Sequence, residues 1–294
     1  MASDRGQKPP PVFSEKVIAF ADILGFSDMV NGASDADLPG LLGLMKELGA
    51  PLDAARFYGV PPMCPCAPRL SDTLDFSITQ VSDCIVISAE KSPAGVINLV
   101  NYCFGIAVRF LQRQMMVRGA IVIGRIFHQG MTIVGEGYQR AVAGEKAVRA
   151  FAKNANAEGG PFIEVGPDVI KYIAEQPDKC VRTMFEGSTH TDGSLVTIYP
   201  FHALATSPAA VVGEDFDPQR WIVSVTGSLS RWQGLRADLQ RRSAGASNRV
   251  QAKFAHSLEG IDHIIARDQD RLRSLKHIIA TGRKPPIGSV WGAL

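Results

Sequence analysis

Residues 17–27 read VIAFADILGFS, and this stretch decides the fold of the chain. Val17 to Ala21 form a continuous apolar run, which is typical of a strand buried on both faces of a sheet. Asp22 follows at the end of that strand, where a charge without a partner is costly to bury. Gly25 then turns the chain toward a helix that we expect from the apolar spacing over residues 38–48. A carboxylate in this position indicates a site rather than packing.

A second aspartate interrupts another apolar run. Residues 77–88 read SITQVSDCIVIS and predict one or two strands bent around Ser82 and Asp83. If the two strands are neighbours, Asp22 and Asp83 reach the same point, and two carboxylates suit a pair of divalent cations. The turn after Asp22 offers backbone N–H groups for phosphate oxygens. The combination predicts a nucleoside triphosphate site; the alternative is that Asp22 caps a helix and Asp83 lies in a bulge.

The remaining periodicity alternates helices and strands. We expect helices over 94–115, 137–154 and 167–175, and strands over 117–127, 161–165 and 194–200. This order, with a hairpin in the middle, predicts an α+β fold with a ferredoxin-like sheet and flanking helices. Beyond a linker near residue 205 the pattern is helical, over 228–241 and 247–280. We therefore expect a flexible arm at 1–13, a domain at 14–205 and a C-terminal helical extension at 206–294.

Composition restricts the partners. The 294 residues carry 31 Lys and Arg against 29 Asp and Glu, so a general field for nucleic acid is excluded. We expect no stretch approaching the ~20 apolar residues that span a bilayer, and hence no membrane association. Five cysteines without a disulfide spacing favour a reduced, cytoplasmic protein. Cys64 and Cys66 are expected to be two loop cysteines rather than part of a zinc site.

Several motifs resemble class III nucleotidyl cyclases. Residues 20–27 (FADILGFS) resemble the FxDIxGFT turn of that family, and Val81-Ser82-Asp83 resembles its second metal-binding aspartate. Residues 117–124 (VRGAIVIG) resemble the RxGIxxG strand, and 133–148 fall where the family has its GxxVNxAxR helix. The resemblance covers about residues 14–200 in the right order. It implies a homodimeric enzyme that forms a 3′,5′-cyclic monophosphate and pyrophosphate. The resemblance also implies that Asp22, the Ile23 carbonyl and Asp83 hold two Mn²⁺ or Mg²⁺ ions, and that Gly25, Phe26 and Arg118 bind the triphosphate. The catalytic residues that it implies are Asp22, Asp83 and Arg118.

The base-reading positions differ from those of purine cyclases. The family's purine-contacting Lys, four positions before the second aspartate, corresponds to Thr79, and its purine-contacting Asp corresponds to about Val134. Neither residue makes those purine contacts. The helix departs further, because Ala141 aligns with the family's Asn and Glu145 with its transition-state Arg. Candidates to replace that Arg are Arg140, Lys146 and Arg149.

The sequences DILGFS and VSDCIVIS, and the segment from Arg118 onward, resemble those of the pyrimidine cyclases of bacterial antiphage (Pycsar) systems. This resemblance implies UTP or CTP as substrate, and cyclic UMP or cyclic CMP sensed by a separate effector. We expect base contacts from Tyr58, Arg56 and Thr79, with Arg69 a further candidate; an Arg contact favours UTP. Two alternatives stay open: an inactive cyclase-like nucleotide sensor, which Glu145 favours, and a polymerase-type palm domain.

Overall fold

The computed structural model describes residues 10–49, 74–113, 115–152, 160–201, 217–244 and 248–282. The predictions for Arg56, Tyr58, Arg69, Cys64 and Cys66 lie outside these residues. The described strands are β1 (Ser14–Ile23), β2 (Phe76–Val81), β3 (Cys84–Glu90), β4 (Val117–Gln129), β5 (Thr132–Val134), β6 (Ile163–Val165), β7 (Thr189–Asp192) and β8 (Leu195–Ile198). The described helices are α1 (Phe26–Asn31), α2 (Leu38–Leu48), α4 (Pro93–Gln112), α5 (Glu136–Lys146), α6 (Pro167–Ala174), α7 (Lys179–Glu186), α9 (Pro218–Ser243) and α10 (Asn248–Thr281).

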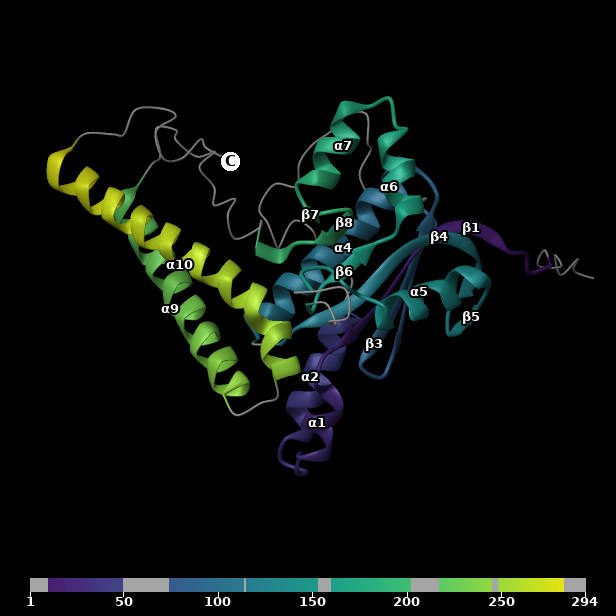
Figure 1. Cartoon of the computed structure of the whole chain (residues 1–294), viewed down its shortest axis with the longest axis horizontal. Coiled ribbons are helices and arrows are strands. Elements are labelled where there is room, and N and C mark those ends of the chain that lie inside the picture. The colour runs from purple at the N-terminus through teal and green to yellow at the C-terminus, as the bar shows by residue number, and fades with distance from the viewer. Residues whose placement is uncertain are drawn as a thin grey trace, which may run out of the picture.

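The strands form one mixed sheet in the order β2-β3-β1-β4-β6-β8-β7, with β5 paired to β4 (Figure 1). β1 is antiparallel to both of its neighbours, β3 and β4. The first four strands, with α1 and α2 between β1 and β2 and with α4 between β3 and β4, make the split βαβ arrangement of a ferredoxin-like sheet. The predicted α+β class is therefore confirmed. β6 extends this sheet parallel to β4.

Successive residues of β1 face opposite sides of the sheet, and the two sides carry different layers. Val17, Ala19 and Ile23 belong to the main core, together with buried residues of α4 such as Leu99. Ile18 belongs to a smaller cluster that includes Ala141 of α5. Asp22, two residues after Phe20 and four after Ile18, consequently lies on the α5 side of the sheet.

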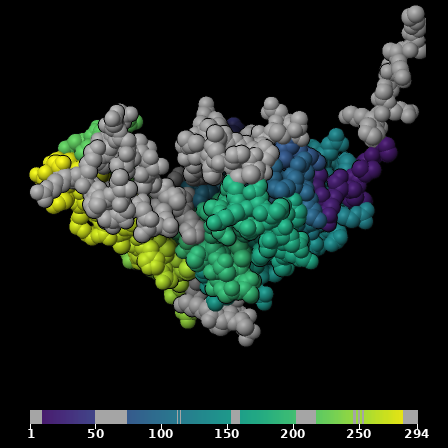
Figure 2. All heavy atoms as spheres, turned by 90° about the horizontal axis from the view of Figure 1, so that it is seen from above, coloured from purple at the N-terminus to yellow at the C-terminus, as the bar shows by residue number. Residues whose placement is uncertain are grey.

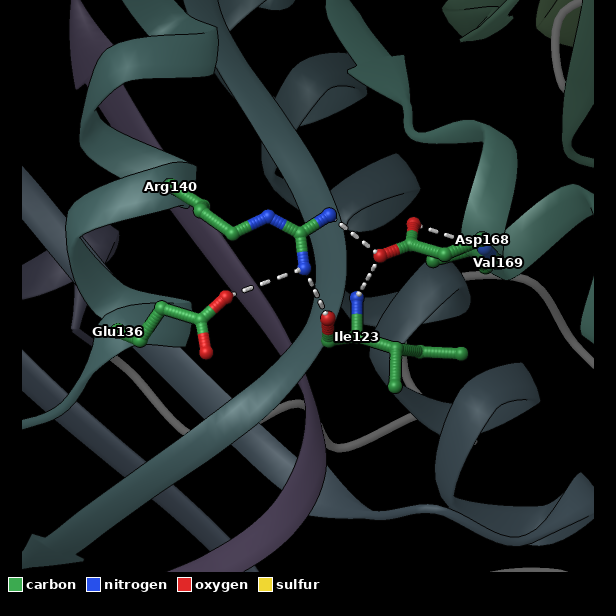
Figure 3. A network of polar contacts seen from close by, with 5 residues as sticks. All are labelled: Ile123, Glu136, Arg140, Asp168 and Val169. Carbon is green, nitrogen blue, oxygen red and sulfur yellow. Dashed lines mark hydrogen bonds and ion pairs between the residues drawn. The ribbon is translucent and has the colours of Figure 1, made fainter.

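A polar network fixes α5 and α6 to β4 (Figure 3). Arg140 on α5 donates to the Ile123 carbonyl (2.8 Å) and to Asp168 Oδ2 (2.7 Å). The same Asp168 oxygen accepts from the Ile123 N–H at 3.0 Å, and Asp168 Oδ1 accepts from the Val169 N–H at 2.9 Å. One carboxylate of α6 thus joins three elements, so this network positions α5 over the sheet.

The C-terminal helices form a long antiparallel hairpin that extends away from the sheet (Figure 1). In the space-filling view the green and yellow atoms of this hairpin project to one side of the molecule (Figure 2). Asp217 caps α9 by accepting from the Gln219 N–H, and Pro218 occupies the first helical position. The hairpin packs against α4 and the segments that flank β4, β6 and β8. It does so through one shared apolar cluster, whose buried members are Leu111, Met116, Phe162, Phe201, Trp232, Leu235, Leu239, Ile261 and Ile264. Both helices were expected, although α9 begins ten residues before the predicted start.

Several local predictions are wrong. The helix expected over 137–154 ends at Lys146. The strand expected over 194–200 is confirmed as β8, although its pairing with β7 in a hairpin that turns at Gly193 (φ +60°) was not predicted. α7 and β7 were not predicted. Within the described residues, the segment Pro93–Leu111 is long and apolar enough to cross a membrane, but 83 % of it is buried inside the fold, as in a core helix. Cys180 is disulfide-bonded whereas Cys84 and Cys103 are free, so the expectation of reduced cysteines fails at Cys180.

Candidate active site

The two aspartates meet at the ends of neighbouring strands. Asp22 pairs with Cys84 in the antiparallel register of β1 and β3, and Asp83 occupies the turn just before Cys84. The Asp83 carbonyl accepts the Ile23 N–H at 3.1 Å, which fixes this turn against the end of β1. Ser82 supports the turn with a left-handed backbone (φ +56°). The Asp22 and Asp83 carboxyl groups lie within hydrogen-bond reach of each other.

The electrostatics of the pair follow from burial and like charge. Burial of Asp22, the nearby Asp83 carboxylate and, more weakly, Glu145 raise the pKa of Asp22 from 3.8 to about 6. The backbone N–H of Ile23, close to the Asp22 carboxyl, opposes this rise. Burial, and after it the same two aspartates, raise the pKa of the Cys84 thiol to about 11. The site therefore carries negative charge that needs a positive partner.

The donor set fits divalent cations that also bind a substrate. Within the described ranges, no group of three or more His, Cys, Asp and Glu side chains is arranged to hold a metal ion. Asp22 and Asp83 make a pair instead. Mg²⁺ commonly binds through one or two carboxylates and completes its coordination with water and substrate phosphate oxygens. Two adjacent carboxylates that repel each other satisfy that requirement.

Arg118 lies next to this pair but bonds elsewhere. Its Cα pairs with that of Asp22 across β1 and β4, so both side chains lie on the α5 side of the sheet. Its guanidinium donates from Nε to Glu145 Oε1 at 2.7 Å, and Nη2 lies 2.5 Å from the same oxygen. Glu145 is 4 % exposed. The structure therefore brings Asp22, Asp83, Arg118 and Glu145 together, and the last of these was predicted only as a departure from the family pattern.

The turn that follows Asp22 has the expected shape. Gly25 adopts a left-handed backbone (φ +79°), and α1 begins at Phe26, whose side chain is buried in the main core. The Leu24 N–H donates to the Met116 carbonyl at 2.9 Å, which ties the turn to the start of β4. Phosphate contacts from the Gly25 and Phe26 backbone, and a metal contact from the Ile23 carbonyl, remain predictions.

The predicted base-reading position is occupied by a buried network. Thr79 on β2 is 3 % exposed, and its hydroxyl bonds to His128 Nε2 (2.8 Å) and to the Gly130 carbonyl (2.5 Å). Ser88 Oγ lies 2.8 Å from the other ring nitrogen of His128, and burial lowers the pKa of that imidazole. A base contact from Thr79 requires its hydroxyl to leave these partners, so it stays a prediction. Val134, on β5, is 51 % exposed.

The three cations proposed to replace the family's Arg differ in their surroundings. Arg140 donates to Asp168 and to the Ile123 carbonyl, whereas Glu145 on the same helix bonds to Arg118. Lys146 and Arg149 are exposed. Ala141 and Glu145, which are four residues apart and both buried, mark the face of α5 that lies on the sheet. That spacing is the sequence signal that identifies Glu145 as inward-facing.

No known family model matches the chain, and no curated protein matches it. Solved structures with partial similarity include a bacterial light-regulated adenylyl cyclase (15 % identity, 56 % of this chain and 46 % of that chain, TM-score 0.37). A second is the guanylyl cyclase Cya2 (10 % identity, 64 % of this chain and 93 % of that chain, TM-score 0.38). A third is a class III adenylyl cyclase-like ATP-binding protein from Pseudomonas aeruginosa (11 % identity, 54 % of this chain and 35 % of that chain, TM-score 0.32). The chain thus spans less than half of the first of these proteins. At such identities and TM-scores these similarities assign no function.

Proposed function

We propose that this chain is a class III nucleotidyl cyclase that converts a pyrimidine nucleoside triphosphate, UTP or CTP, into the 3′,5′-cyclic monophosphate and pyrophosphate. The observation that supports the reaction is the contact between Asp22 and Asp83 at the ends of β1 and β3, with Arg118 on the adjacent strand. The pyrimidine assignment rests on the sequence resemblance to Pycsar cyclases and on Thr79 and Val134 at the purine-reading positions.

In this proposal the chain's own residues bind and orient the substrate. Asp22 and Asp83, with the Ile23 carbonyl, hold two Mn²⁺ or Mg²⁺ ions. When bound, those ions lower the pKa of the ribose 3′-hydroxyl and neutralise the leaving pyrophosphate. Arg118 uses the N–H groups that Glu145 leaves free to bind phosphate oxygens. The Gly25–Phe26 turn places backbone N–H groups beside the triphosphate.

The biological setting follows from the same resemblance. We propose a homodimer whose product is a second messenger in bacterial antiphage defence, detected by a separate effector protein. The proposal includes a cytoplasmic location and no nucleic acid binding, and the near-neutral charge of the chain supports the second of these.

The test is turnover of each of the four nucleoside triphosphates with Mn²⁺, followed as pyrophosphate release and cyclic nucleotide by mass spectrometry. Wild type should act on UTP or CTP, and Asp22→Ala and Asp83→Ala should each lose at least about 10²-fold in kcat. Glu136→Ala, an exposed carboxylate on α5, is the matched control. Absence of pyrophosphate from every triphosphate would exclude the enzyme, and product from ATP or GTP alone would exclude the pyrimidine assignment.

A nucleotide-binding sensor without turnover is the second candidate. Glu145 favours it, because a carboxylate at the position aligned with the transition-state Arg cannot stabilise a negatively charged phosphoryl group, and here it also engages Arg118. Tight binding of UTP or CTP without product would identify this function.

A further inference from the structure

Glu145 draws Arg118 away from the carboxylate that it faces. Asp22 and Arg118 are partners in the register of β1 and β4, and directly opposed side chains of opposite charge in a sheet normally pair. Among the ion pairs of the described residues, however, Arg118 joins Glu145 and not Asp22. Consistent with this, burial and then its acidic neighbours raise the pKa of Asp22, and no guanidinium lowers it.

The helix is built to deliver Glu145 to this place. α5 lies so close to the sheet that a Cβ added to Gly144 would lie 2.7 Å from the Ala120 Cβ, and one added to Gly137 would lie 3.0 Å from the Gly124 Cα. This approach buries Glu145 to 4 % exposure. A carboxylate so deeply buried is costly unless it is paired, and Arg118 supplies the pair.

Charge balance shows what the pair leaves behind. Asp22, Asp83 and Glu145 bring three carboxylates against one guanidinium. Because Glu145 takes the guanidinium, no ion pair of the described residues places a cation on Asp22 or Asp83. Two of the five N–H groups of Arg118 bond to Glu145, which leaves three for another acceptor.

We propose that Glu145 is a positioning residue that prevents Arg118 from neutralising Asp22, and so keeps the Asp22–Asp83 pair available to divalent cations and the rest of Arg118 available to the triphosphate. This inference rests on the proposed metal-dependent function. It gives the carboxylate at the position aligned with the transition-state Arg a role of its own. Loss of Glu145 should release Arg118 onto Asp22, where it competes with the metal.

The experiment measures Mn²⁺ binding alone, by electron paramagnetic resonance of free Mn²⁺, on the full chain without nucleotide. Glu145→Gln should weaken Mn²⁺ binding by about 10- to 100-fold, the range of one charge-assisted pair. Adding Arg118→Gln to Glu145→Gln removes the competitor and should restore binding. Glu136→Gln is the control on the same helix, with 66 % of its side chain exposed.

Glu145→Asp separates positioning from charge, since it keeps the carboxylate but shortens its reach. Weakened Mn²⁺ binding by Glu145→Asp supports positioning, and wild-type binding by this variant overturns it in favour of a simple field effect.

If Glu145→Gln does not fold, as judged by circular dichroism, Glu145→Asp and Arg118→Gln carry the test, and Arg118→Gln must bind Mn²⁺ at least as well as wild type. Equal Mn²⁺ binding by wild type and Glu145→Gln would overturn this inference and leave the proposed function intact. If the variants change Mn²⁺ binding as expected but wild type turns over no nucleotide, the proposed function is overturned and the role of Glu145 stands.

Discussion

Asp22 on β1 lies directly opposite Arg118 on β4, yet the guanidinium of Arg118 bonds to Glu145 on α5. Asp22 is left against Asp83, and its pKa rises to about 6 as a result of burial and like charge. A site with this arrangement is destabilising in the free protein, and the divalent cations of the proposed function would offset the repulsion between the two carboxylates. The carboxylate pair therefore lowers the stability of the fold while it serves the proposed function, and this effect can be measured.

The first consequence is a pH-dependent gain in stability when Asp22 is neutralised. The pKa of Asp22 rises from the 3.8 of an unperturbed aspartate side chain to about 6 in the fold, so the folded state binds the proton more tightly than the unfolded chain does. Stability then falls as pH rises from about 4 to about 6 and stays low above that window. Asp22→Asn should therefore raise the free energy of unfolding at pH 8 in EDTA.

The measurement is urea unfolding of wild type and Asp22→Asn at pH 4 and pH 8. The difference between them should be larger at pH 8 and shrink toward pH 4. An equal difference at both pH values, or a loss of stability at pH 8, would contradict the raised pKa. Asp28→Asn, on α1 close to the site turn and exposed, is the control.

The sequence predicts this part of the molecule well because the signal is local. A charge that interrupts an apolar strand, as at Asp22 and Asp83, stands out against the hydrophobic pattern, and the pairing of β1 with β3 brings the two together. The direction of Arg118 could not be predicted in the same way. It depends on how closely α5 approaches β4, which is a property of tertiary packing.

The C-terminal part shows a different limit. α7, β7 and the hairpin turn at Gly193 were missed, because short elements of four to eight residues carry too few periodic positions to identify. The position of the α9–α10 hairpin depends on a long-range apolar cluster that joins Trp232 to residues such as Leu111 and Phe162, and helical periodicity alone does not reveal the partner of an apolar face.

The second prediction concerns the close packing of α5. A Cβ at Gly124 would lie 2.6 Å from the Gly137 Cα, which is backbone and cannot turn aside. Gly124→Ala should therefore cost about 1–3 kcal/mol of folding free energy through overpacking. Gly234→Ala is the matched control, since that glycine is exposed on α9 with nothing within 4 Å of an added Cβ. It should stabilise by about 0.5–1 kcal/mol through helix propensity.

Thermal unfolding of both variants checks this contrast. If Gly124→Ala proved as stable as wild type, the packing between β4 and α5 would be looser than the structure describes. The close approach that buries Glu145 would then be contradicted.

The third prediction compares two carboxylates in the network of Figure 3. Asp168→Ala leaves the Ile123 N–H and the Nη2 group of Arg140 without their shared acceptor, and should cost about 1–3 kcal/mol. Glu136→Ala removes only an exposed contact to Arg140 at 3.8 Å, and should change stability by less than about 0.5 kcal/mol. Urea unfolding at pH 7 measures both. Equal effects would mean that Asp168 acts as a surface charge rather than as the link between α5, β4 and α6.

The last prediction links the C-terminal hairpin to the active-site turn. Leu24, two residues after Asp22, packs against the cluster that contains Leu235 of α9, which is 2 % exposed. Leu235→Ala should destabilise the chain by about 2–5 kcal/mol, and the cavity it leaves removes support from Leu24. Mn²⁺ binding should therefore weaken as well, although Leu235 carries no ligand atom. Val223→Ala on the same helix, at a residue 74 % exposed, should change neither quantity. Loss of stability in Leu235→Ala with wild-type Mn²⁺ affinity in the folded protein would show that the hairpin supports the fold without positioning the turn that carries Asp22.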